Sequence, residues 1–414
     1  MSAIPSTTTL SLKTSSRLHA VAIFAAAVYL FVLPFGHVTA LRNVAFLVAF
    51  CSSIWLWTTT KDKHIPLVWV FAAWFGIACL SLYWTHDTTT TLEAIKQEII
   101  KSAATFFVFF TITRETPAFR VWATTTAACL IAIAIFAAIL FPIQGPWSKG
   151  YLPPRGDFAT MAVTILPLLV GFFALQLRKR RFTDSLIFAA TIGTLYTGFV
   201  THSRAFWLGL LCLVFLGSAL SFRRTKRFNR RKLAGILIVT VIAFGLASLA
   251  AHDRQQDVWD VSDRTLIYSS VIGKVAINPW LGTGFGHEAD KVWYETTLRY
   301  PGVSHPHNIV LSYMDQLGVV GIALLAAIFL SIARPLTIAL RSSDDSSAML
   351  GMIGLAMLGA VFIKNNFDMF FIGQSLWLFF AHAGIYLGQL RNKEQLAAPA
   401  RGGLEFASKT DARL

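Results

Sequence analysis

The chain has few charged residues. Only 14% of its 414 residues are Asp, Glu, Lys or Arg, and 55% are hydrophobic. Soluble domains carry about 25% charged residues, so this composition argues against a soluble enzyme. Apolar runs of about 20 residues recur along the whole sequence, and runs of this length predict transmembrane helices. The composition therefore predicts an all-α polytopic membrane protein.

Cysteines and paired acidic residues are also scarce. No Asp-x-Asp pair lies in an outer loop, and no histidines, cysteines and carboxylates show the spacing of a metal site. We therefore predict no metal and no cofactor. The sequence also lacks the Gly-x-Ser-x-Gly or Ser-x-x-Lys pattern of serine hydrolases at a suitable depth. All four cysteines fall inside apolar runs, where we expect small core residues: Cys51, Cys79, Cys129 and Cys212.

Basic residues outnumber acidic ones, 36 to 21, which gives a net charge of +15. Such a charge invites a nucleic-acid interpretation, but the distribution argues against it. The basic clusters at 178–181 and 223–232 each lie between two apolar runs. Clusters in this position are typical of cytoplasmic loops that contact anionic lipid. We therefore predict membrane lipids, and no nucleic acid, as partners.

The apolar runs predict about twelve membrane spans. About two thirds of the 36 lysines and arginines fall on one side of this arrangement together with both termini, so the positive-inside rule predicts cytoplasmic termini. The first span is expected to be a retained helix, because no convincing cleavage site follows it. The spans are predicted at 18–35, 40–58, 66–83, 92–112, 119–141, 158–177, 185–201, 204–222, 233–250, 307–333, 347–364 and 369–389.

One long segment between the spans is too polar to cross a membrane and is expected to form a large outer loop with short helices. Within it, apolar residues at helical spacing predict a helix over 264–277, and Asn278-Pro279 is expected to end that helix. The predicted divisions are spans one to nine at 1–251, the outer loop at 252–306, the last three spans at 307–390 and a flexible cytoplasmic tail at 391–414.

A glycine run follows the predicted loop helix, with Gly282, Gly284 and Gly286 in alternate positions. It resembles a phosphate-binding loop, but no predicted strand precedes it and no P-loop lysine is in place. We therefore do not predict nucleotide binding. We expect a turn that brings the outer loop close to the bundle.

The most informative motif is Ser304-His305-Pro306-His307-Asn308, where the outer loop meets an apolar run. Polar side chains at a membrane boundary are costly, so a water-accessible reaction site is a good explanation for them. The neutral imidazole of His307 could take a proton from a hydroxyl, and Asn308 could orient a sugar or phosphate oxygen. The alternative is that His305 and His307 are interfacial histidines bonded to loop backbone. The residue types alone leave both open.

Two arginines lie on the same outer side. Arg204 opens a span after Thr201-His202-Ser203, and Arg264 starts the predicted loop helix. A guanidinium binds a diphosphate well, whereas the alternatives are snorkelling for Arg204 and a surface ion pair with Asp263 or Asp260 for Arg264. Together with the histidines they predict an active site for a phosphate-bearing substrate, with His202 a further binding candidate.

Other polar residues belong to the same outer mouth or to a polar cavity below it. Arg155 could add positive charge to the mouth. Lys101 and Glu98 lie deep enough in the fourth span to suggest a cavity, although a Glu98–Lys101 pair would satisfy both. The run from Lys364 to Asp368 is most simply interpreted as a solvated outer turn.

These residues together resemble a known family. His307-Asn308 is followed after nine residues by Gly318 and then by Gly321, a pattern similar to that of bacterial O-antigen ligases. This family shares a superfamily with O-antigen polymerases and protein O-oligosaccharyltransferases. Arg204 after Thr-His-Ser, Arg264 in a large loop and the Asn278-Pro279-Trp280-Leu281-Gly282 run agree with the resemblance. It covers about 150–325 well and the first spans by hydropathy alone.

The resemblance implies a GT-C-like glycosyltransferase of the inner membrane with its active site facing the periplasm. The donor would be a glycan on undecaprenyl diphosphate, and the acceptor would be a sugar hydroxyl of lipid A–core. His307 would be the general base, and Arg204 and Arg264 would bind the diphosphate. The reaction would be metal-independent and inverting. His305, Asn308, Arg155, Lys101 and His202 are the candidate substrate-binding residues.

Three functions remain open from the sequence. The first is the ligase. The second is another enzyme of the superfamily, a polymerase or a protein O-oligosaccharyltransferase, although one large outer loop and a short inner tail favour neither. The third is a transporter or flippase for a lipid-linked glycan, which predicts charges near the bilayer midplane and internal symmetry. The polar residues gather at one outer face, which favours an enzyme.

Overall fold

The computed structural model describes residues 7–116, 118–144, 152–176, 181–201, 203–225, 261–297 and 305–411. Within these residues the chain is helical and contains no strand. In chain order the elements are α1 (Thr7–Val32), α2 (Thr39–Thr59), α3 (Val68–Leu80), η1 (Ser81–Tyr83), α4 (Thr88–Ala94), η2 (Ile95–Ile100), α5 (Lys101–Glu115), α6 (Phe119–Gln144), α7 (Arg155–Gln176), α8 (Arg181–Val200), α9 (Arg204–Thr225), α11 (Val261–Ile277), α12 (Lys291–Thr296), α13 (Ile309–Leu340), α14 (Asp345–Phe367) and α15 (Gly373–Asp411).

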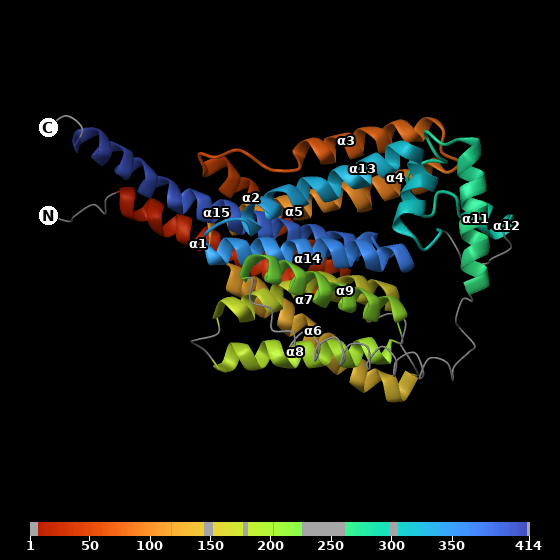
Figure 1. Ribbon diagram of the computed structural model, residues 1–414, viewed down its shortest axis with the longest axis horizontal. Helices are drawn as coiled ribbons and strands as arrows, with labels where there is room; N and C mark the ends of the chain where they lie inside the picture. Colours follow the sequence, from red (N-terminus) through yellow and green to blue (C-terminus); the bar gives the residue numbers. More distant parts are fainter. Residues whose placement is uncertain are drawn as a thin grey trace.

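Most of these helices run side by side along the long axis of the molecule (Figure 1). The start of α1 and the end of α15 lie at one end of this bundle. At the other end α11 crosses almost at right angles to the other helices, with α12 beside it. The outer-loop helices therefore cover the end of the bundle opposite to the first and last described helical residues.

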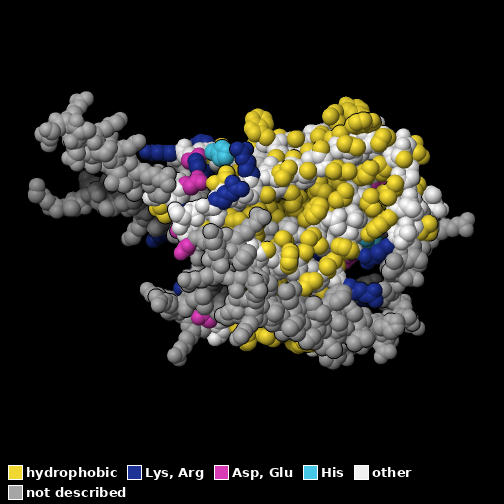
Figure 2. All heavy atoms as spheres, in the orientation of Figure 1, with side chains coloured by type: hydrophobic (Ala, Val, Ile, Leu, Met, Phe, Trp, Pro, Cys, Tyr) yellow, Lys and Arg dark blue, Asp and Glu magenta, His cyan; other side chains and the backbone are white. Residues whose placement is uncertain are grey.

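Among the residues that the structure describes, five helices are long and apolar enough to cross a membrane: Thr39–Thr59, Phe119–Leu140, Arg155–Phe172, Ile309–Leu340 and Asp345–Phe367. Each other predicted span within the described residues overlaps a helix, whereas the one at 233–250 lies outside them. Hydrophobic side chains cover the middle of the visible face, and charged ones gather toward its two ends (Figure 2). The protein is thus a polytopic membrane protein, and the total of twelve spans stays a prediction.

The tail predicted from residue 391 begins inside α15, which continues to Asp411, and its flexibility stays a prediction. Arg391 forms an ion pair with Asp62 at 2.8 Å, and Lys393 pairs with Asp344 at 2.9 Å. The sequence after Arg391 is also rich in residues with high helix propensity. These contacts hold the early part of the predicted tail against the end of the bundle.

A sharp kink divides α13 at Gly318, whose backbone angles of φ 61° and ψ −148° are open only to glycine. The glycine run of the outer loop binds this kink through its backbone. Gly284 N donates to Gln316 O at 2.9 Å, and Val319 N donates to Pro279 O at 2.8 Å. The expected turn toward the bundle is confirmed, and the close backbone approach explains the motif glycine Gly318.

The loop helix is also confirmed, since α11 spans Val261–Ile277 and stops immediately before Asn278-Pro279. Its apolar side chains Ile267, Val271 and Val275 are buried with Tyr294 of α12.

The fourth predicted span has a less expected feature. Its helix changes to π-helical geometry at η2, and a π-helix inside an α-helix often marks a functional site.

Candidate active site

His307 lies next to a carboxylate at the end of the bundle covered by α11. Its Nδ1 is 3.5 Å from Oδ1 of Asp368, the residue that follows α14. The backbone of His307 has φ 54°, a left-handed conformation that costs a non-glycine residue about 1–3 kcal/mol. The bond from Met369 N to His307 O, at 3.1 Å, helps to hold this conformation. The strained turn points the imidazole toward Asp368.

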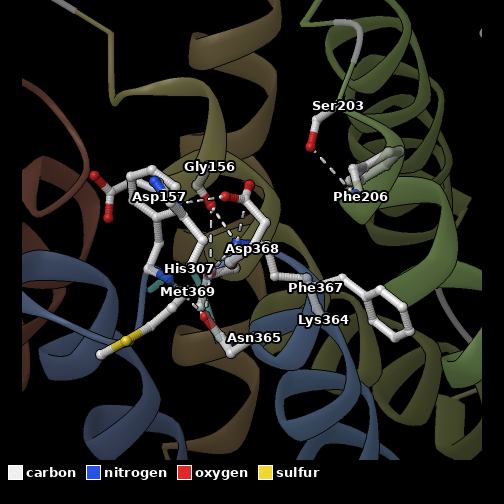
Figure 3. Close-up of polar contacts among 12 residues, drawn as sticks. Gly156, Asp157, Ser203, Phe206, His307, Lys364, Asn365, Phe367, Asp368 and Met369 are labelled. Carbon is white, nitrogen blue, oxygen red and sulfur yellow. Dashed lines mark hydrogen bonds and ion pairs between the residues drawn. The ribbon is translucent and has the colours of Figure 1, made fainter. Parts of the chain in front are cut away.

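Asp368 is fixed in turn by Lys364, whose side chain is fully buried. The Lys364 ammonium donates to Asp368 O at 2.6 Å, to Gly156 O at 2.9 Å and to Thr160 Oγ1 at 2.9 Å (Figure 3). The interpretation of the run from Lys364 to Asp368 as a solvated outer turn is therefore wrong. The run sits against the start of α7, a neighbour about 200 residues away that local hydropathy could not reveal.

The charge of Asp368 is favoured by its surroundings. Burial alone would raise the pKa of this carboxyl, but the Lys364 ammonium and the hydrogen bond from His307 outweigh burial and lower the pKa below its ordinary value. An ionised carboxylate beside Nδ1 holds the imidazole in the tautomer whose Nε2 is free of a proton. In this tautomer Nε2 can accept a proton from a substrate hydroxyl.

Arg264 joins this group from α11. Its guanidinium donates from Nη1 to Phe367 O, one residue before Asp368. In the same helix, the Tyr268 hydroxyl lies close to the Asn308 side chain. The structure thus brings together Arg264 and His307, which are far apart in sequence. The alternative ion-pair partners of Arg264, the Asp260 and Asp263 side chains, lie outside what the structure describes.

His305 differs from His307 although the two rings are only 4.5 Å apart between centroids. It is buried, and its Nε2 lies 3.2 Å from the carbonyl oxygen of Met369. Burial and the neighbouring His307 and His287 imidazoles lower the pKa of His305 to about 3. A ring that binds protons so weakly is a poor base, so the geometry favours His307.

A second imidazole–carboxylate pair, which the sequence patterns did not predict, lies nearby. His287, at the end of the glycine run, places Nδ1 2.8 Å from Oε1 of Glu98 in η2. Burial would lower the pKa of His287, but Glu98 reverses this effect and raises it. Glu98 thus pairs with His287 and not with Lys101, the partner in the alternative interpretation. The ring centre of His287 lies 6.1 Å from that of His305, so His305 has an imidazole neighbour on either side, His287 and His307.

Asn308 has a structural task. Its Oδ1 accepts from Leu311 N at 3.0 Å as the N-cap of α13, and its Nδ2 donates to Asn366 O at 2.9 Å. An N-cap satisfies backbone donors that a helix start leaves open. Both polar groups of the amide have protein partners, so the part of Asn308 in substrate binding stays a prediction.

Arg204 is exposed at the first position of α9. A Cβ on Gly209 would lie 3.2 Å from Cβ of Lys364, so α9 passes beside Lys364. Five residues of helix span about 7.5 Å, which places Arg204 beyond Lys364 toward the same end of the bundle. Figure 3 shows the start of α9 through Phe206 and through Ser203, the residue before the helix. Among the described contacts, none joins Arg204 to His307.

The other predicted binding residues are spread more widely. Arg155 begins α7 next to Gly156, whose carbonyl binds Lys364. The Lys101 ammonium lies 4.6 Å from the ring centre of Trp377 in α15, so it belongs to a separate contact group. His202 lies outside the described residues. Their roles in binding stay predictions.

The described residues contain no group of three or more histidine, cysteine or carboxylate side chains that could hold a metal ion. The site instead combines an imidazole–carboxylate pair with arginine and lysine side chains. Such a site can take a proton from a hydroxyl and stabilise a departing anion.

Two comparisons with known proteins show what this chain is similar to. Residues 186–326, which include Arg204, Arg264 and His307, match a family model described as O-antigen ligase. An O-antigen ligase of Pseudomonas aeruginosa strain PAO1 is 26% identical over 273 residues, covering 64% of this chain and 63% of the relative. The match thus spans less than two thirds of that relative. Together these matches confirm the resemblance to the O-antigen ligase family.

Proposed function

We propose that this chain, whose resemblance to the O-antigen ligase family both comparisons confirm, is itself an O-antigen ligase. It transfers a glycan from undecaprenyl diphosphate to a sugar hydroxyl of lipid A–core at the periplasmic face of the inner membrane. The observation that carries the proposal is the His307–Asp368 pair with Arg264 beside it, at the end of the bundle that α11 covers.

The proton transfer belongs to His307. Its Nε2 takes the proton of the acceptor hydroxyl while the oxygen forms its bond to the anomeric carbon. Asp368 holds Nδ1 and stabilises the imidazolium that results, because its carboxylate is kept charged by Lys364. The strained backbone at His307 fixes the direction of the ring.

The leaving group is undecaprenyl diphosphate. Arg264 and Arg204 bind its phosphate oxygens and stabilise the negative charge that grows as the glycosidic bond breaks. One displacement on an α-linked donor inverts the anomeric centre. The exposed position of Arg204 suits a contact made only when the donor is bound.

The test is a transfer assay with purified protein, a lipid-linked glycan and lipid A–core. Wild-type protein is expected to modify the acceptor, and His307→Ala and Arg264→Ala are each expected to abolish transfer while the protein still accumulates. Activity is expected to persist in excess chelator. Wild-type-like transfer by His307→Ala would sink the mechanism, and a loss of activity restored by magnesium would contradict the metal-free prediction.

The same assay separates the alternatives. Extension of one lipid-linked glycan by another, with lipid A–core left unmodified, would identify a polymerase. Modification of a protein acceptor would identify an O-oligosaccharyltransferase. In vesicles, movement of the donor from one leaflet to the other without any glycan transfer would identify a flippase.

A further inference from the structure

α11 carries a second basic residue, Lys274, ten positions after Arg264. Only 13% of the Lys274 side chain is exposed, and its ammonium lies 2.7 Å from Oδ1 of Asp315 in α13. It also forms an ion pair with Asp290, the residue before α12. A cation removed from water is costly unless charged partners compensate for it. Here two carboxylates do so, and each comes from a different element.

The contacts around Lys274 extend this connection. The Tyr294 hydroxyl donates to the other Asp315 oxygen, Oδ2, at 2.9 Å. The ammonium of Lys274 also lies 4.3 Å from the ring centre of Trp293. One buried group therefore ties α11, α12 and α13 together.

Asp315 is itself held in a rigid part of the chain. Its carbonyl accepts from Thr283 N at 2.9 Å, so the residue is bonded to the glycine run. It lies three residues before Gly318, where α13 kinks. Lys274 thus fixes the last turn of α11 to a kink that further backbone bonds already hold.

The other half of α11 reaches the active site. Ten residues of α-helix span about 15 Å and behave as a stiff rod. Buried Ile267 and Val271 lie between the two basic residues and keep the rod seated on the bundle. Arg264 lies at the other end of this rod, where its guanidinium reaches Phe367 beside Asp368.

We infer that Lys274 is a positioning residue, which places Arg264 at the diphosphate site through its ion pairs with Asp290 and Asp315. Lys274 itself does not contact the substrate. The inference rests on the proposed function, because it takes Arg264 as a ligand of the diphosphate. It also explains why the outer helix is joined to the bundle by charges in addition to apolar contacts.

A double-mutant cycle on binding of undecaprenyl diphosphate to the full-length protein in detergent tests this inference. Loss of one well-placed arginine contact weakens binding about tenfold, so Arg264→Ala is expected to raise the Kd by that factor. Lys274→Met is expected to do the same. Because Lys274 acts through Arg264, the double variant is expected to bind no more weakly than Arg264→Ala alone. Lys274→Arg, which keeps the ion pairs, is expected to bind as the wild type does.

Lys274→Met leaves two carboxylates buried without a partner and could prevent folding. A variant with Lys274→Met, Asp290→Asn and Asp315→Asn removes all three charges and serves in its place, with the same expected Kd. A loss that is additive with Arg264→Ala would show a merely structural role and overturn the inference.

Two further outcomes separate this inference from the proposed function. Normal binding by both Lys274 variants, with weak binding by Arg264→Ala, would overturn the positioning role alone. Normal binding by Arg264→Ala would overturn the role of Arg264 in the proposed function, and the positioning role would fall with it. Failure of Lys274→Arg to restore binding would show that the ion pairs are not what places Arg264.

Discussion

His305 and His307 are two residues apart and have opposite surroundings. His307 faces a carboxylate across 3.5 Å, whereas His305 is buried against the carbonyl of Met369. A proline between them and the left-handed backbone at His307 direct the rings differently. The resemblance assigned the base to His307 and substrate binding to His305, and the carboxylate beside His307, Asp368, lies about 60 residues later in the chain.

Replacement of Asp368 by asparagine tests whether this carboxylate supports the base. Asp368→Asn removes the charge that stabilises the imidazolium of His307, so the rate of transfer is expected to fall about 10²-fold or more. The matched control is Asp345→Asn, at the opposite end of the same helix, which is expected to transfer normally. Transfer by both variants at the wild-type rate would show that Asp368 has no part in the reaction.

His305 predicts a pH dependence of stability. Its pKa is about 3 in the folded protein and ordinarily 6.5, so below pH 6.5 the unfolded chain binds a proton that the folded protein does not. The free energy of unfolding therefore decreases as the pH falls from 6.5 toward 3. His305→Asn removes this titration while other groups remain, so its Tm is expected to fall less than that of the wild type between pH 7 and pH 5. Parallel curves would contradict the prediction.

The helices of the outer loop show what local sequence can reveal. The helix over 264–277 and its break at Asn278-Pro279 follow from spacing and from proline chemistry, and the structure has both. The kink at Gly318 was not predicted, because the apolar pattern continues across it. Its cause is a contact with the loop backbone at Pro279 and Trp280, far away in the chain.

This kink gives a prediction about Gly318. A Cβ there would lie 2.4 Å from the carbonyl carbon of Trp280, and φ 61° with ψ −148° is strained for any other residue. Gly318→Ala is expected to lower the free energy of unfolding by about 1–3 kcal/mol, and the clash adds to this cost. Thermal unfolding in detergent measures it. Gly273→Ala, where a Cβ meets no atom within 4 Å, is the control and is expected to be neutral or slightly stabilising.

In the molecule as a whole, the active site is assembled from segments that hydropathy treats independently. The membrane helices could be predicted because an apolar run is a local property. The contact between Lys364 and Gly156 joins residues 208 positions apart, and Glu98 pairs with His287 across 189 positions. No periodicity in one sequence encodes such pairs. The residue types predicted a site that binds an anionic substrate. The pairing of its histidines with Asp368 and Glu98 became visible only in the tertiary structure.

The arrangement of the two ends of the bundle predicts the topology. α13 starts beside His307, and the part after its kink, residues 319–340, spans about 33 Å of helix, whereas the hydrocarbon core is about 30 Å thick. The two ends of α13 are therefore expected to lie on opposite sides of the membrane. The far end is followed by Asp344, which pairs with Lys393 of α15. The basic residues of the sequence are concentrated on the side of that end, which the positive-inside rule assigns to the cytoplasm.

Cysteine labelling tests this topology. Ser269 is exposed on α11, and Ser343 is exposed between α13 and α14. In a background without the native cysteines, Ser269→Cys is expected to react with a membrane-impermeant maleimide in cells whose outer membrane alone is permeabilised. Ser343→Cys is expected to react only after the inner membrane is opened. The reverse pattern would place His307 in the cytoplasm, where a lipid A–core acceptor displayed on the periplasmic face could not reach it, and the proposed ligase reaction would fail with it.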